Sequence, residues 1–363
     1  MLVVNAGSSS LKLTLIGARD ETLAERELAA PQASIDQSEL RSALDAGLGN
    51  ADVVGHRIVH GGGLFREPVR IDEEVESALR QLVELAPLHQ PKSIDALDAV
   101  TAALPDLPAV ACFDTAFHAT LPEAAATYAL PSEWRTRWQL RRYGFHGLSH
   151  AWVARRVPEL LGSAKASRIV SCHLGAGASL CAINEGRSID TTMGFTPLEG
   201  LVMATRSGSV DPGMLLWLLE RSDLSERALA HALEHEAGLL GLTGTADMRE
   251  VLARAAGGDH AAQVALDIYL HRLLGGIGAM TASLRGIDAL VFTGGVGEHA
   301  AQIREHAALA LDFLGIAVDA RRNRGLGREG EISAHRARVR TVVVRAREDL
   351  EIARQVRALF ATS

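Results

Sequence analysis

Three short glycine-containing turns, at residues 6–10, 174–178 and 294–297, each follow an apolar segment of the chain. Glycine lets a backbone approach phosphate oxygens closely, and the exposed N–H groups of such a turn can bind those oxygens. Any one of these turns could serve only as a tight connection. Three in one chain, two of them rich in serine or alanine, favour a nucleotide-binding protein. The first turn does not match a Walker A loop, and no dinucleotide-binding fingerprint follows a strand.

Three residues with hard oxygen donors, Asn5, Asp114 and Glu348, lie at or near the ends of expected strands. Mg²⁺ needs few protein ligands of this kind, because it keeps water molecules and phosphate oxygens around it. A structural explanation also exists, since Asp114 could cap a helix and Glu348 could be a charge at a helix N-terminus. Taken one at a time, these structural explanations are the better ones.

Two arginines, Arg57 and Arg206, occupy positions where a negatively charged ligand or side chain is expected beside them. Arg57 interrupts the apolar run 53–60, and a buried strand rarely carries an unpaired arginine. Arg206 lies in a tight turn at residues 204–208. A guanidinium suits a planar carboxylate or a phosphoryl transition state, and the structural alternative for each arginine is a buried ion pair.

His146 and His150 are four residues apart, a spacing found in zinc proteases. That motif requires a glutamate directly after the first histidine, and Gly147 stands there instead. Two hydrogen-bonded histidines on one helix face are the more common explanation of this spacing. The sequence therefore argues against a zinc site.

Hydrophobic periodicity predicts the elements that must position these residues. Strands are expected at residues 2–5, 11–16, 52–59, 109–113, 168–173, 179–184, 289–293 and 341–344, and helices at 73–85, 94–103, 259–284 and 349–360. Both halves of the chain begin with strand, small-residue turn and returning strand, which suggests two copies of a hairpin-led α/β unit. This start does not fit the strand-then-helix opening of a dehydrogenase. Residues 294–297 are expected as a turn and 321–330 as a surface loop.

Composition narrows the partners and the compartment. The 363-residue chain has a formal net charge of −7 and only 4% aromatic residues, which argues against a nucleic-acid surface. No apolar stretch approaches the length of a membrane span, and the N-terminus lacks the pattern of a signal peptide. Three sparse cysteines, Cys112, Cys172 and Cys181, fit a reducing compartment better than a disulfide framework. We therefore expect a cytoplasmic protein with no membrane and no nucleic-acid partner.

Five blocks of sequence, at residues 5–12, 113–118, 141–147, 190–203 and 292–298, resemble the acetate kinase family of short-chain carboxylate kinases. The blocks are long, specific and in family order, so the resemblance covers essentially the whole chain. The stretch between the opening hairpin and Val54 is shorter than is usual in that family. The resemblance implies an α/β protein with the duplicated ribonuclease H-like, actin-like ATPase fold shared by acetate and sugar kinases, Hsp70 and actin. It also implies a homodimer and two domains with an interdomain cleft, residues 1–117 plus 350–363 and residues 118–349.

The resemblance further implies roles for individual residues. The catalytic residues would be Asp114, Arg57, Arg206, His146 and His89. The pocket for the substrate methyl group would contain Val59, Leu88, Phe145 and Pro197. The phosphate and nucleotide site would contain Ser8, Ser10, Lys12, His173, Gly175, Gly177, Asp247, Met248, Arg249, Gly295, Val296 and Gly297. Asn5 and Glu348 would lie at Mg²⁺, which Mn²⁺ could replace.

The activity that the resemblance implies is reversible transfer of a phosphoryl group from ATP to acetate, giving ADP and acetyl phosphate. Two residues depart from the family pattern, because Ala176 and His299 each replace an asparagine. The loss at Ala176 removes a side-chain hydrogen bond near the phosphates but keeps the backbone donors of the turn, so we expect activity to survive. Two alternatives stay open. One is a propionate- or butyrate-preferring kinase on the same scaffold, and the other is a nucleotide-binding regulator with weakened catalysis.

Overall fold

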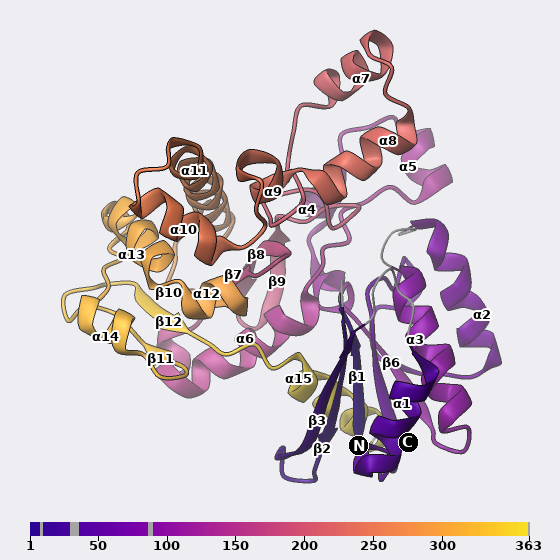
Figure 1. Ribbon diagram of the computed structural model, residues 1–363. Helices are drawn as coiled ribbons and strands as arrows, with labels where there is room; N and C mark the ends of the chain where they lie inside the picture. Colours follow the sequence, from indigo (N-terminus) through magenta and orange to yellow (C-terminus); the bar gives the residue numbers. More distant parts are fainter. Residues whose placement is uncertain (8–9, 30–35, 86–89, 362–363) are drawn as a thin grey trace. The chain divides into compact units, whose positions relative to one another are not determined.

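The computed structural model describes residues 1–7, 10–29, 36–85 and 90–361 (Figure 1). Two compact units divide the chain. Unit 1 contains Met1–Ala119, Phe145–Trp152 and Arg347–Ser363, and unit 2 contains Thr120–Gly144 and Val153–Ala346. The domain boundaries expected from the sequence stay a prediction. The expected site residues Ser8, Leu88 and His89 lie outside the described residues.

Unit 1 is built on a mixed six-stranded sheet with the order β3-β2-β1-β4-β6-β5. Its strands are β1 (Leu2–Ala6), β2 (Ser10–Ile16), β3 (Thr22–Ala29), β4 (Val54–Ile58), β5 (Val69–Arg70) and β6 (Ala109–Phe113). The first three strands form an antiparallel meander, whereas β1, β4 and β6 run parallel. Parallel neighbours bring their carboxyl ends to one edge of the sheet, which is where open α/β sheets bind ligands.

Alternating side chains bury both faces of this sheet, as period-two strands require. Leu2 and Val4 pack with residues of α1 (Gln37–Ala43) and α3 (Gln90–Ala103). Val3, between them in sequence, packs on the other face with Ile352 and Val356 of α15 (Glu348–Ala361). The expected amphipathic helix near residue 73 is also present, as α2 (Glu73–Gln81).

Unit 2 contains a second six-stranded sheet with the order β11-β12-β10-β7-β8-β9. Its strands are β7 (Arg168–Leu174), β8 (Ala178–Asn184), β9 (Arg187–Thr191), β10 (Ala289–Thr293), β11 (Gly330–Glu331) and β12 (Arg340–Val343). Its helices are α4 (Glu123–Ala126), α5 (Ser132–Trp138), α7 (Pro212–Arg221), α8 (Glu226–His231), α9 (Gly238–Thr243), α10 (Met248–Ala256), α11 (His260–Ser283), α12 (Gly294–His299), α13 (Ala301–Ala310) and α14 (Ala320–Gly325). The helix α6 (Gly147–Leu161) begins in unit 1 and continues in unit 2.

The two sheets share one topology. In each, the first three strands form an antiparallel meander, and strand one also pairs in parallel with strand four. In each, a further parallel strand follows and a short antiparallel strand ends the sheet. This repetition confirms the predicted duplicated actin-like ATPase fold.

Local expectations failed at two places. Residues 294–297 do not form a separate turn, because α12 begins at Gly294 and a glycine with φ 79° opens it directly from β10. The stretch 321–330 is not a loop throughout, since Asp319 caps α14 by accepting hydrogen bonds from the N–H groups of Arg321 and Arg322. The third strand of each meander, β3 and β9, was not predicted. Among the described residues, no helix is long and apolar enough to span a membrane.

Candidate functional site

A polar cluster in unit 1 gathers four of the predicted site residues at one edge of the sheet. Asn5 lies near the end of β1, Arg57 lies in β4, and Asp114 directly follows β6. Because these three strands are parallel neighbours, their side chains meet. Glu348, the first residue of α15, completes the cluster.

Short polar contacts connect all four side chains. Arg57 donates to Asp114 Oδ2 from Nε at 3.0 Å and from Nη2 at 2.6 Å. Its Nη1 donates to Asn5 Oδ1 at 2.9 Å and lies 3.8 Å from Glu348 Oε2. Asn5 Nδ2 in turn donates to Glu348 Oε2 at 3.0 Å. The structure thus brings together residues that are up to 343 positions apart in sequence.

The charged side chains of this cluster are mostly buried, and burial shifts their pKa values. The Asp114 side chain is 2% exposed and that of Arg57 14%. Burial disfavours the charged form of Arg57, but the carboxylates of Asp114 and Glu348 outweigh it and raise the pKa of Arg57. Burial also raises the pKa of Asp114, and the adjacent guanidinium opposes that rise. Asp114 Oδ1 is buried and accepts no hydrogen bond from the described residues.

His146 sits next to this cluster through the main chain. Its φ of 55° is unusual for a residue other than glycine. The following N–H, of Gly147, donates to the Asp114 carbonyl oxygen at 2.8 Å, and α6 begins there. His146 therefore precedes the helix that carries His150, and the expectation of two histidines on one helix face was wrong.

The apolar side chains expected at the substrate are divided between the units. Phe145 is buried in unit 1, and its ring meets the His60 ring edge-on with centroids 5.4 Å apart. Val59, adjacent to His60 in the chain, is half-buried. Pro197 belongs to unit 2, where its carbonyl oxygen accepts from Arg206 Nη1 at 3.2 Å.

Arg206 also forms an ion pair in unit 2, with Glu234. The sequence had suggested such a pair as the structural alternative but had not identified the acidic residue. Arg206 Nε lies 3.1 Å from Glu234 Oε2, and these side chains are 16% and 7% exposed. The structural alternative considered for both arginines, a buried ion pair, is therefore present at Arg57 and at Arg206. Glu234 was missed because nothing near it in sequence distinguishes it from the glutamates around it.

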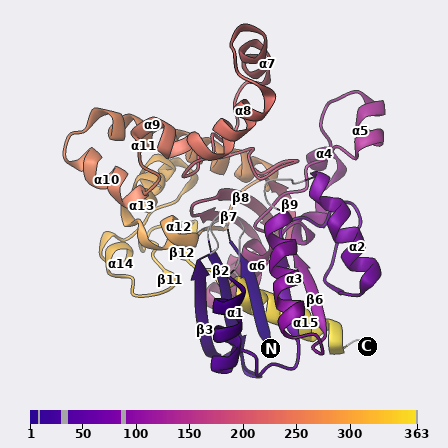
Figure 2. The same cartoon turned by 45° about the vertical axis from the view of Figure 1, so that its right-hand side comes forward.

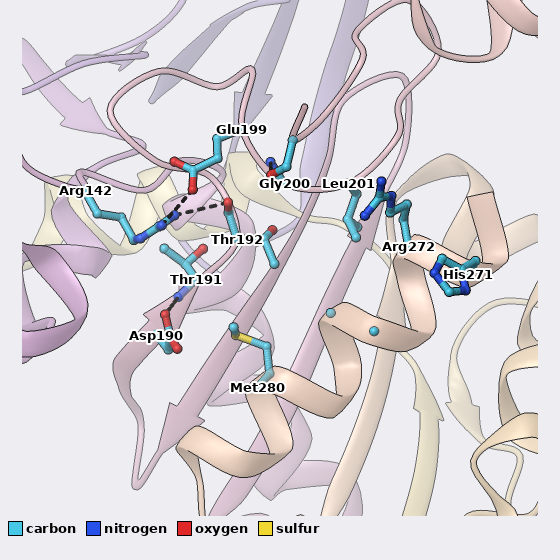
Figure 3. Close-up of a pocket in the computed structure, with 13 residues that line it drawn as sticks. Arg142, Asp190, Thr191, Thr192, Glu199, Gly200, Leu201, His271, Arg272 and Met280 are labelled. Carbon is cyan, nitrogen blue, oxygen red and sulfur yellow. Dashed lines mark hydrogen bonds and ion pairs between the residues drawn. The ribbon is translucent and has the colours of Figure 1, made fainter. Parts of the chain in front are cut away.

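The loop that carries Pro197 is held by Arg142 (Figure 3). Arg142 Nη2 donates to Glu199 Oε1 at 2.8 Å, and Nη1 donates to the carbonyl oxygen of Thr192 at 3.2 Å. Tyr128, another residue missed from the sequence, donates to Glu199 Oε2 at 2.6 Å and accepts from the N–H of Phe195 at 2.9 Å. Arg142 of the block 141–147 thus joins the block 190–203 in one network in unit 2.

A cavity of about 740 Å³ in unit 2 collects half of the predicted phosphate and nucleotide residues. Gly175, Asp247, Met248, Arg249, Gly295 and Val296 line it, as do both departing residues, Ala176 and His299. Apolar side chains, among them Leu239, Leu252 and Tyr269, form much of its remaining wall. Asp247 caps α10, and its ion pair with Arg249 lowers the pKa of Asp247 to about 2.

The other described residues expected at the nucleotide do not line this cavity. Gly177 accepts a hydrogen bond from the N–H of Gly175 at 2.9 Å, and Gly297 is buried within α12. His173 is the next-to-last residue of β7. In unit 1, Ser10 Oγ donates to Glu27 at 2.6 Å and Lys12 pairs with Glu25 at 3.1 Å, so both side chains contact β3.

The chain is similar to known proteins over most of its length. Residues 23–354 match the model of the Acetokinase family. The acetate kinase of Nostoc punctiforme is 50% identical over 308 residues, which span 84% of this chain and 76% of the relative. The crystal structure of Porphyromonas gingivalis acetate kinase superposes with a TM-score of 0.89 at 34% identity over 99% of both chains. A propionate kinase from Francisella tularensis superposes with a TM-score of 0.90 at 35% identity over 98% of both chains.

Proposed function

The chain belongs to the acetokinase family, and we propose that it catalyses reversible phosphoryl transfer from ATP to acetate, giving ADP and acetyl phosphate. The observation that carries this proposal is the cluster of Asn5, Arg57, Asp114 and Glu348. It concentrates a guanidinium and oxygen donors at the carboxyl ends of parallel strands, where a phosphoryl group and a carboxylate can be held.

For this reaction the protein must align the two reactants and stabilise the charge on the transferring phosphoryl group. An acetate oxygen attacks the γ-phosphorus, the bond from that phosphorus to the β–γ bridging oxygen breaks, and ADP leaves in line. Acetate is already ionised at neutral pH, because carboxyl groups of this kind have pKa values of about 4. No general base is therefore needed, and Asp114 serves metal and water positioning.

The charged side chains take complementary roles in this proposal. Arg57 and Arg206 hold the substrate carboxylate and the transferring phosphoryl group. His146 donates to the phosphoryl oxygens as they gather charge, together with His89. Such positive groups stabilise the transition state most when they are fixed beforehand. Val59, Leu88, Phe145 and Pro197 surround the methyl group of acetate.

The donor set fits Mg²⁺ as the cofactor, with Mn²⁺ as a substitute. Asp114 offers a buried carboxylate oxygen without a hydrogen-bond partner among the described residues, and Asn5 and Glu348 add further oxygens. Within the described chain, no group of three or more His, Cys, Asp or Glu residues could hold a metal alone. A small set of oxygen donors such as Asn5, Asp114 and Glu348 suits Mg²⁺, because the ion keeps several waters and binds phosphate oxygens. When bound, Mg²⁺ neutralises charge on the β- and γ-phosphates.

The cavity of unit 2 is the proposed adenosine site. Its apolar wall suits a purine base, and polar groups at Asp247 and Arg249 lie beside it. Gly175, Gly177, Gly295, Val296 and Gly297 would present their backbone to the phosphates, with His173 nearby. Ser8, Ser10 and Lys12 are also proposed at the phosphates, and of these Ser10 contacts Glu27 and Lys12 contacts Glu25 in the structure.

A homodimer is the proposed assembly. The helix α7 has no buried residue, and Met214, Leu216 and Trp217 are 44%, 63% and 59% exposed. The two views show α7 standing away from the sheet of its own unit (Figure 2). Exposed apolar clusters of this kind mark protein contacts. A cytoplasmic location is also proposed, supported by three cysteines that are free and buried.

A propionate-preferring kinase is the second candidate, because the structure is equally similar to a propionate kinase. One methylene changes binding by only about 1–3 kcal/mol, so the scaffold tolerates either substrate. Comparing kcat/KM for acetate, propionate and butyrate with ATP and Mg²⁺ decides between them. A clear preference for a longer acid would remove the acetate assignment.

Trapping acetyl phosphate as its hydroxamate tests whether the protein is a kinase at all. The wild type is expected to form product, and Arg57→Ala is expected to abolish it, because Asp114 is left without its charge partner. Asp95→Ala is the control, since Asp95 lies outside the cluster and has no role in this mechanism. No product from the wild type, with nucleotide binding retained, would instead indicate a regulator.

A further inference from the structure

Glu234 is the buried acidic partner of Arg206, and it belongs to none of the sequence blocks that identify the family. The two residues are 28 positions apart and meet with Nε and Oε2 at 3.1 Å. Both side chains lie in unit 2 and are mostly buried, at 16% exposure for Arg206 and 7% for Glu234.

The backbones on either side of this ion pair are joined to each other. The N–H of Ser207 donates to the Leu233 carbonyl oxygen at 3.1 Å, and the N–H of Ala237 donates to that of Thr205 at 3.0 Å. The hydroxyl of Thr205 also donates to the Glu234 carbonyl oxygen at 2.9 Å. The segment with Glu234 is therefore fixed against the turn with Arg206, so the ion pair does not depend on two freely moving side chains.

A glycine allows the two segments to approach so closely. Gly238 has a φ of 61°, and a Cβ at this position would lie 2.3 Å from the Met203 carbonyl oxygen and 2.7 Å from that of Arg206. Both atoms belong to the main chain, so neither can rotate away. The close approach of residues 203–206 to residues 234–238 is thus part of the fold.

Two oxygens lie against the guanidinium of Arg206, one as an ion-pair partner and one as a hydrogen-bond acceptor. Glu234 lies at Nε, and the Pro197 carbonyl oxygen accepts from Nη1 at 3.2 Å. A guanidinium is planar, so contacts at two of its nitrogens determine the orientation of the whole group. Unit 1 offers a comparable case, because Arg57 also has a carboxylate at Nε, that of Asp114, and a second oxygen at Nη1, that of Asn5.

We infer that Glu234 is a positioning residue, which orients the Arg206 guanidinium for the carboxylate and the transferring phosphoryl group. The inference rests on the proposed function, in which Arg206 contacts substrate. Glu234 itself contacts Arg206 and not the reacting atoms. A small misplacement of a catalytic group can lower a rate about 100-fold, so losing this contact lowers kcat more than substrate affinity.

The test compares Glu234→Ala with Glu234→Gln in the full-length protein. Alanine removes the acceptor, and we expect kcat for acetyl phosphate formation to fall at least tenfold, with the KM for ATP within twofold of wild type. Glutamine keeps an oxygen acceptor of the same reach, and we expect it to restore most of the rate. Glu236→Ala is the matched control, because Glu236 lies two residues away with its side chain 64% exposed.

A double-mutant cycle separates positioning from a general structural role. In an Arg206→Lys background there is no guanidinium to orient, so adding Glu234→Ala should change kcat less than twofold. Equal fold losses in both backgrounds would overturn the inference. So would a Glu234→Gln protein that folds normally yet is as slow as the alanine variant.

Two further results would also overturn it. Glu234→Ala activity within twofold of wild type would show that Arg206 is oriented without the carboxylate. A lower KM for acetate at unchanged kcat would show that Glu234 competes with substrate for Arg206. Absence of acetyl phosphate formation by the wild type is a different result, because it would refute the proposed function itself.

Discussion

Replacing Gly147 by alanine should separate catalysis from nucleotide binding. The Gly147 N–H donates to the Asp114 carbonyl oxygen at 2.8 Å. A Cβ at residue 147 would lie 2.1 Å from that oxygen, 3.0 Å from its carbon and 3.1 Å from Phe117 Cβ. The closest atoms belong to the main chain, so no side-chain rotation relieves the clash.

The displacement that alanine forces can be bounded from these distances. Real Cβ contacts essentially never fall under 3.0 Å, so the 2.1 Å approach must open by about 0.9 Å. That movement acts on His146, one residue earlier, and on Asp114, whose carboxylate holds Arg57 at 2.6 Å. A misplacement of this size costs roughly 100-fold in rate, and overpacking of this kind costs about 1–3 kcal/mol of stability.

The hydroxamate assay measures the rate, and fluorescent nucleotide binding measures the state of the cavity in unit 2. We expect kcat to fall about 100-fold, with nucleotide affinity changed far less because Gly147 does not line the proposed adenosine cavity. Gly278→Ala is the control, since a Cβ at this helical position meets no atom within 4 Å. A Gly147→Ala protein with kcat within twofold of wild type would refute the reasoning.

Three further predictions concern the nucleotide, pH and assembly. Ala176→Asn should lower the KM for ATP about tenfold by restoring a hydrogen bond to a charged group, and an unchanged KM would contradict this. Burial lowers the pKa of His56 and His60 to about 4, whereas the pKa of histidine in an unfolded chain is near 6.5. Between these two pH values the unfolded chain therefore binds more protons than the folded protein does. Stability in urea should therefore fall as pH drops from 6.5 to 4, by about 1.4 kcal/mol per pH unit and histidine, and His56→Gln should reduce that slope. In light scattering, the wild type should have the molar mass of a dimer and Trp217→Glu that of a monomer. A wild type with the mass of a monomer would refute the proposed homodimer.

Much of the sheet framework was predictable from the sequence, because the inner strands are apolar and bounded by turn residues. The strands β1, β4, β6, β7 and β10 were all expected near their observed positions. The edge strand β3 was missed, since most of its side chains are exposed and its charges hide the alternation of a strand. The start of α12 was missed for a different reason, because glycines are poor helix formers and tertiary packing places them there.

The site divides in a similar way. The residue types and the order of the five blocks were enough to identify the family and its chemistry. Spacing along the chain could not show that Glu348 meets Asn5, because that contact depends on α15 returning to β1. Nor could it distinguish Glu234 from Glu236, since only the fold buries one and exposes the other.

The sequence by itself determined the family, the duplicated fold and the residue types that phosphoryl transfer requires. Motifs carry this information because the chemistry requires particular residue types: glycines in phosphate turns, arginines at charged substrates and carboxylates at the metal. These requirements hold whatever residues surround them. Only the tertiary structure decided which groups orient others, through Asp114 at Arg57 and Glu234 at Arg206. Side-chain orientation comes from contacts between segments that are distant in sequence. Burial then makes these contacts important, because removing the partner of a buried charge leaves that charge uncompensated in surroundings of low dielectric constant.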